Sequence, residues 1–147
     1  MNQKIKQLKT LLYLDEQTVA ESLLKYTQAK KDHTDLDLQH KMLISYQEEY
    51  NQRLKGNSTN VLNAHTLQIY YKFVSNLGVA ISEQQQKASS ANEIATKLFN
   101  EYLKLKQKAE GLEKVVENEI ELERQYQQKQ EQKQNDEVAG SQWNKKK

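Results

Sequence analysis

The absence of proline is the feature that most restricts how this chain can fold. None of its 147 residues is proline, and four are glycine. At the usual frequency of about 5%, a chain of this length would carry roughly seven prolines. Proline marks turns, strand edges and helix starts, so its absence favours long uninterrupted helices and argues against an all-β domain. Hydrophobic residues make up 36% of the chain, which argues against a deep, compact core.

One segment has the composition of a turn, residues 55–60. It combines Gly56, suited to follow the last residue of a helix, with several candidate N-cap residues. We therefore predict one hairpin over residues 1–134, with a helix at 3–54, a turn at 55–60 and a second helix at 61–130. Residues 135–147 follow a Gln-rich stretch, and we predict that they form a disordered tail.

Both predicted helices carry a heptad repeat, the pattern of coiled coils. In the first helix, ten of fifteen repeat positions are apolar: Ile5, Leu8, Leu12, Asp15, Val19, Ser22, Tyr26, Ala29, His33, Leu36, His40, Leu43, Gln47, Tyr50 and Leu54. In the second helix, thirteen of fifteen are apolar: Tyr70, Val74, Leu77, Ile81, Gln84, Ala88, Ala91, Ala95, Leu98, Tyr102, Leu105, Ala109, Leu112, Val116 and Glu119. The sequence thus predicts an all-α fold, a long antiparallel two-helix coiled-coil hairpin with a disordered C-terminal tail.

The register of the hairpin can be estimated from the position of the turn. Folding about residue 58 pairs residues whose numbers add to about 116. That register sets Leu43 beside residue 73 and Gln39 beside residue 77. It also brings a basic start against an acidic stretch, Lys4, Lys6 and Lys9 against Glu110, Glu113 and Glu117, although exposed ion pairs of this kind contribute little stability. The second helix should then project alone beyond about residue 113, where it would be marginal without a partner.

The composition and motifs exclude several classes of function. Cysteine is absent, which excludes disulfides, thiolate nucleophiles and cysteine-based zinc sites. We find no membrane span, no signal peptide, no phosphate-binding loop and no catalytic motif. A net charge of +2 is too balanced for a dedicated nucleic-acid binder. We read His33 and His40 as polar residues of the coiled-coil interface and His65 as solvated, and we expect no enzyme activity, metal or cofactor.

Two apolar stripes flank the predicted turn, and both have the spacing i, i+4, i+7, i+11 of one helical face. The first helix carries Gln39, Leu43, Tyr46 and Tyr50, and the second carries Phe73, Leu77, Ala80 and Gln84. Tyr46, Phe73 and Ala80 lie outside the heptad series. Because two helices cannot bury two apolar faces each, these residues suggest a patch for a partner. A wider interface or a drift of the register near the turn are the alternatives.

The segments 39–50 (QHKMLISYQEEY) and 71–81 (YKFVSNLGVAI) resemble the FliJ family, the small coiled-coil proteins of the bacterial flagellar type III export apparatus. The resemblance implies an antiparallel hairpin like the stalk subunit of rotary ATP synthases. It also implies three partners: the export ATPase hexamer, whose pore receives the end with the termini (Ile5–Tyr26 and Glu110–Arg124), the cytoplasmic domain of the export gate, and export chaperones. It places the protein in the cytoplasm, peripheral at the cytoplasmic face of the inner membrane, without membrane insertion.

The same resemblance assigns gate binding to the two stripes, Gln39, Leu43, Tyr46 and Tyr50 with Phe73, Leu77, Ala80 and Gln84. The last position is typically His in enterobacterial members, whereas here it is Gln84, which can hydrogen-bond but cannot titrate. The alternatives are the equivalent stalk protein of a virulence-type secretion system, a generic coiled-coil scaffold or tether, and an amphipathic helix on a membrane surface.

Overall fold

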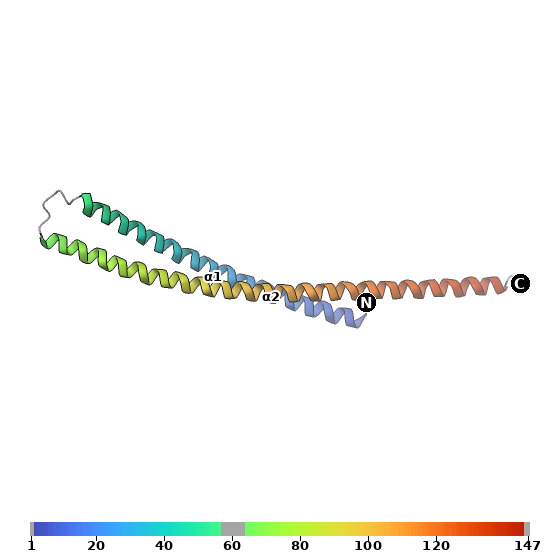
Figure 1. Ribbon diagram of the computed structural model, residues 1–147. Helices are drawn as coiled ribbons and strands as arrows, with labels where there is room; N and C mark the ends of the chain where they lie inside the picture. Colours follow the sequence, from blue (N-terminus) through green and yellow to red (C-terminus); the bar gives the residue numbers. More distant parts are fainter. Residues whose placement is uncertain (1, 57–63, 146–147) are drawn as a thin grey trace. The chain divides into compact units, whose positions relative to one another are not determined.

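The computed structural model describes residues 2–56 and 64–145, and these residues form two helices, α1 (Gln3–Gly56) and α2 (Ala64–Lys145). The two helices pair in antiparallel directions (Figure 1), as the heptad pattern predicts. The chain divides into two compact units, one formed by residues 1–21 with 103–147 and the other by residues 22–102. We call them the terminal unit and the central unit, and each contains a segment of both helices.

Most of the predicted turn, 57–60, and the first predicted residues of the second helix, 61–63, lie outside the described residues. The first helix ends at Gly56 rather than at residue 54, and no glycine among the described residues has a positive φ. Gly56 is therefore the last residue of α1, whereas the sequence suggested that it would follow the last helical residue.

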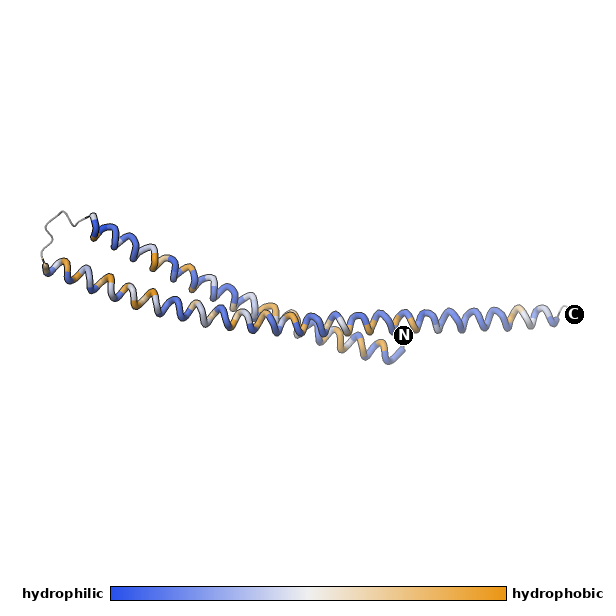
Figure 2. The backbone as a smooth tube through the Cα atoms, viewed as in Figure 1, coloured by the Kyte–Doolittle hydropathy of each residue, from blue (hydrophilic) through white to orange (hydrophobic). Residues whose placement is uncertain are grey.

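The seam between α1 and α2, meaning the thirty heptad positions predicted above, is confirmed by burial. Each of the fifteen positions on α1 and the fifteen on α2 is buried or half-buried, while the residues between them are mostly exposed. Figure 2 shows the corresponding recurrence of hydrophobic residues along both helices. Among the residues that the structure describes, Ile5 is the most deeply buried large side chain, at 1% exposure. The heptad pattern therefore identifies which face of each helix packs against the other.

The register differs from the predicted one by a heptad. In the central unit Gln39 contacts Gln84 and Tyr50 contacts Phe73, and in the terminal unit Lys4 contacts Glu119; the residue numbers of each pair add to 123, not to about 116. A shift of seven residues returns every seam position to the seam, so hydrophobic spacing alone cannot distinguish the two registers. Lys4 therefore pairs with Glu119 and not with Glu110, Glu113 or Glu117, as the predicted register implied.

The corrected register lengthens the paired part of the terminal unit. The Lys4 ammonium lies 3.1 Å from the Glu119 carboxylate, and the Asn2 amide donates a hydrogen bond to Glu123 at 3.4 Å. The start of α1 thus reaches residues 119–123 of α2. This is beyond residue 113, after which we expected the second helix to project alone. Because the Lys4 side chain is mostly exposed, this ion pair contributes at most about 1 kcal/mol.

The end of α2 corrects a second expectation. We predicted that the helix ends near residue 130 and that a disordered tail follows, whereas α2 continues through Lys145. Every side chain from Arg124 to Lys145 is exposed, and Figure 2 shows this part of α2 as mostly hydrophilic. Gln, Lys and Glu are favourable helix formers, and no proline interrupts them. A polar composition was therefore insufficient to end the helix.

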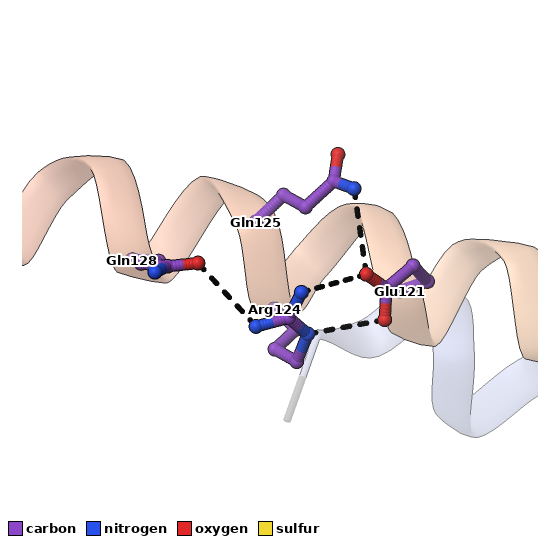
Figure 3. Close-up of polar contacts among 4 residues, drawn as sticks. All are labelled: Glu121, Arg124, Gln125 and Gln128. Carbon is purple, nitrogen blue, oxygen red and sulfur yellow. Dashed lines mark hydrogen bonds and ion pairs between the residues drawn. The ribbon is translucent and has the colours of Figure 1, made fainter.

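We call the fully exposed residues 124–145 of α2 the overhang. At its start, neighbouring side chains of α2 contact one another (Figure 3). The Arg124 guanidinium donates two hydrogen bonds to the Glu121 carboxylate, at 2.8 and 3.1 Å, and a third to Gln128 at 3.3 Å. The hydrogen bonds from Arg124 to Glu121 lower the pKa of Glu121, and the Glu121 carboxylate raises the pKa of Arg124. Both groups are fully solvated, so the contacts support the helix only locally.

Candidate functional site: a two-helix surface in the central unit

All eight predicted partner-binding residues lie in the central unit, four on each helix. We call them the α1 stripe (Gln39, Leu43, Tyr46 and Tyr50) and the α2 stripe (Phe73, Leu77, Ala80 and Gln84). Each stripe consists of two seam residues alternating with two residues on one flank of the seam. Since every stripe residue is on a continuous helix, regular helical geometry fixes the spacing of the side chains.

The two stripes meet across the seam at both of their ends. The Gln84 amide donates a 2.9 Å hydrogen bond to the Gln39 side-chain oxygen and a longer one, 3.4 Å, to the backbone carbonyl of Leu36. At the other end, the rings of Tyr50 and Phe73 pack edge-on with centroids 4.7 Å apart. The stripes therefore form one surface on one side of the paired helices, as predicted, but with partners shifted by one heptad.

The stripe residues divide into those that hold the helices together and those that face solvent. Leu43, Tyr50, Leu77 and Gln84 belong to the seam and are half-buried, as is Ala80. Gln39 is exposed, and the two aromatic side chains outside the seam, Tyr46 and Phe73, retain 46% and 44% of their exposure. Part of the wider-interface alternative is thus correct, because Phe73 packs on Tyr50. The surface nevertheless leaves nearly half of each of these two aromatic side chains exposed to solvent.

Residues that the sequence reasoning did not select adjoin this surface near the helix ends. Arg53 lies over the Tyr50 ring, 5.6 Å from its centroid, and pairs with Glu49 at 2.9 Å. Ile69 and Tyr70 line a small open cavity of about 190 Å³ together with Tyr50 and Phe73. Tyr70 was recognised as a seam residue, but Ile69 lies outside the heptad series, so periodicity gave no reason to select it.

The histidines occupy the predicted environments. His33 and His40 are half-buried in the seam, and His65 is exposed. Within residues 2–56 and 64–145, no three acidic or histidine side chains gather as a metal site would require. Over the same residues, no helix contains a stretch apolar enough to cross a membrane. The side chains of the two stripes carry apolar, aromatic and amide groups.

Comparison with known proteins identifies the family of this chain. A family model described as the flagellar FliJ protein matches residues 3–147, which is nearly the entire chain. No curated protein and no solved structure matches it. The family match covers both helices, both stripes and the overhang of α2. The chain therefore belongs to the FliJ family, whose members are non-enzymatic components of bacterial flagellar type III protein export.

Proposed function

We propose that this protein couples the flagellar export ATPase to the export gate, binding the gate's cytoplasmic domain through the two stripes. The observation that carries the proposal is the joint surface, on which Gln39–Gln84 and Tyr50–Phe73 contacts hold the stripes together while Tyr46 and Phe73 stay exposed. Exposed aromatic side chains beside a packed, partly polar surface are the usual anchors of protein interfaces. Membership of the FliJ family supports an assignment of that surface to export.

The proposed ATPase-binding region is the terminal unit. Family membership supports insertion of this end into the ATPase hexamer, with residues 5–26 and 110–124 as the segments concerned. Contact with both machines would place the protein at the cytoplasmic face of the inner membrane without insertion into it. Handling of emptied export chaperones belongs to the same proposal.

Binding of the isolated cytoplasmic domain of the export gate tests the stripes. Replacing both Tyr46 and Phe73 by Ala removes the two exposed rings while leaving most of the seam in place, and we expect affinity to fall at least about tenfold. The control is Tyr71→Ala, because Tyr71 is also an exposed aromatic residue, at 61%, but lies outside both stripes. Unchanged binding by the double variant, with helicity preserved in circular dichroism, would contradict the proposed gate surface.

ATPase activity distinguishes a coupling protein from a generic coiled-coil scaffold. The full chain should co-purify with the cognate flagellar ATPase and stimulate its turnover, because the proposed stalk acts on the hexamer directly. The same measurement with a virulence-system ATPase tests the alternative assignment. Absence of both stimulation and co-purification with either ATPase would leave only the scaffold.

A further inference from the structure

The heptad positions used by the stripes continue along the same side of the central unit. Asp32 lies one heptad before Gln39, and Leu36 lies one heptad before Leu43. On α2, Ile94 lies two heptads beyond Ala80. Residues seven apart on paired helices share one side of the coiled coil. The side that carries the stripes therefore extends past Gln39 and Gln84, further from the turn.

These continuing positions line an open groove of about 630 Å³, immediately beside the Gln39–Gln84 contact. Its walls include Asp32, Leu36, Glu83, Lys87, Ala91 and Ile94. The groove exists because α2 is lined with small residues here. Ala88 is buried in the seam, and Ser90 and Ala91 leave the space beside it unfilled. A large apolar side chain from outside could occupy that space without displacing a seam residue.

The groove combines an apolar wall with a negatively charged rim. Ile94 is 56% exposed, which is a large apolar area to leave in water beside the seam. Two carboxylates, Asp32 and Glu83, line the groove against one ammonium, that of Lys87. The exposed Asp32 carboxylate accepts a 2.9 Å hydrogen bond from the Gln28 side chain, one helical turn earlier. An apolar centre with a polar, charged rim is the usual composition of a protein interface.

We infer that the partner of the stripes also fills this groove, inserting a large apolar side chain that is flanked by Lys or Arg. The inference rests on the proposed function, since the occupant is a further segment of the same gate domain. Continuity along one side of the helices is the reason for choosing that occupant. A partner that covers the stripes and extends along this side meets the groove directly beyond Gln84, and its basic residue faces Asp32 and Glu83.

The test measures binding of the full chain to the cytoplasmic domain of the export gate. Ile94→Glu places a third carboxylate in the groove and removes the most exposed large side chain of its apolar wall, so we expect affinity to fall about tenfold. Asp32→Lys, on the other helix, should weaken binding about fivefold and reduce its dependence on salt. The matched control is Val79→Glu, because Val79 is exposed to 57% but occupies the outer face of α2, and its affinity should equal that of the wild type.

The outcomes separate this inference from the proposed function. Loss of binding by Ile94→Glu and by the Tyr46/Phe73 variant, with Val79→Glu unaffected, supports both. Wild-type affinity for Ile94→Glu and Asp32→Lys, with loss only in the stripe variant, overturns the groove and leaves the proposed function intact. Wild-type affinity for the stripe variant overturns the proposed function, and the groove as its extension falls with it. Circular dichroism of each variant establishes that the helices remain intact.

Discussion

The terminal and central units use the same heptad spacing but fill the seam differently. In the terminal unit, eight of the ten seam positions are aliphatic, and Ile5 and Val116 are buried to 1% and 5% exposure. In the central unit, five of the twenty seam positions are polar and four are alanine, and the residues buried there are small, Ser22, Ala88 and Ala95. Among the described residues, large side chains are thus fully buried only in the terminal unit.

The contrast between the two units indicates that one contributes more to stability and the other carries the proposed binding surface. Burying large aliphatic side chains supplies most of the hydrophobic free energy of a coiled coil, whereas alanine and polar residues contribute less. The central unit keeps aromatic residues at the flank of its seam, where they remain available to a partner. Its small seam residues also create the groove beside Gln84. The region that is less well packed therefore carries the proposed binding surface.

The register of the central unit offers the test with the largest expected effect. Ala29 and Ala95 are seam residues whose numbers add to 124, whereas Ala29 and Ala88 would pair if the helices shifted by one heptad. Because the chain has no cysteine, any disulfide in a variant must join the two introduced cysteines. We expect nearly complete disulfide formation in the Ala29→Cys/Ala95→Cys variant and little in the Ala29→Cys/Ala88→Cys variant, measured by gel mobility. The reverse result would contradict the observed register.

A pair of alanine substitutions tests the difference between the two seams. Ile5→Ala removes the most buried large side chain of the terminal unit and should lower the free energy of unfolding by about 2–3 kcal/mol. His40→Ala, at a half-buried polar position of the central unit, should change it by less than about 1 kcal/mol. Urea unfolding followed by circular dichroism measures both. Equal losses of unfolding free energy in the two variants would show that the seams of the two units contribute equally to stability, contrary to the proposed difference.

Glycines within α2 test a smaller, stabilising effect in each unit. A methyl group added at Gly78, in the central unit, would meet the Gln47 side chain at an ordinary contact distance of 3.7 Å, and one at Gly111, in the terminal unit, would enter open space. Neither glycine has a positive φ. Gly78→Ala and Gly111→Ala should therefore each stabilise the protein by about 0.5–1 kcal/mol, mainly through lost freedom of the unfolded chain. A destabilised Gly78→Ala variant alone would indicate tighter packing in the central unit.

The smallest expected effect is a pH dependence at the start of the α2 overhang. Hydrogen bonds from Arg124 lower the pKa of Glu121 in the folded chain, so the carboxylate stabilises the helix above its ordinary pKa of about 4.3. That stabilisation disappears as the pH falls through the lowered value. Helicity should therefore decrease slightly on acidification, and Glu121→Gln should remove part of the decrease. An identical acid response in this variant would show that the contact contributes nothing.

Much of the architecture could be predicted from the sequence because hydrophobic spacing is a local property. The absence of proline and the two heptad series predicted the antiparallel hairpin, and each predicted seam position is buried or half-buried. The same spacing placed the stripes on one face of each helix. Tyr46 and Phe73 were recognised as flanking residues because they fall between seam positions, and nearly half of each side chain is exposed.

The errors have two physical sources. Helical propensity extends α2 through Lys145, although every side chain from Arg124 to Lys145 is exposed. The amino-acid composition of this segment therefore could not show where the helix ends. The register error arose from the repeat itself, since a shift of seven residues returns every seam position to the seam. Specific side chains distinguish the two registers, among them Gln39 with Gln84 and Lys4 with Glu119, and their pairing is visible only when both helices are in place.

The sequence by itself determined that this chain forms two long helices, which face of each is apolar, and where aromatic residues exceed what the seam can bury. Each of these follows from the order of residues along one helix. Only the tertiary structure decided which residues lie opposite one another, and hence that the stripes meet at Gln39–Gln84 and Tyr50–Phe73 and that a groove opens beside them. Contacts between helices depend on register, and a repeating pattern leaves the register undetermined.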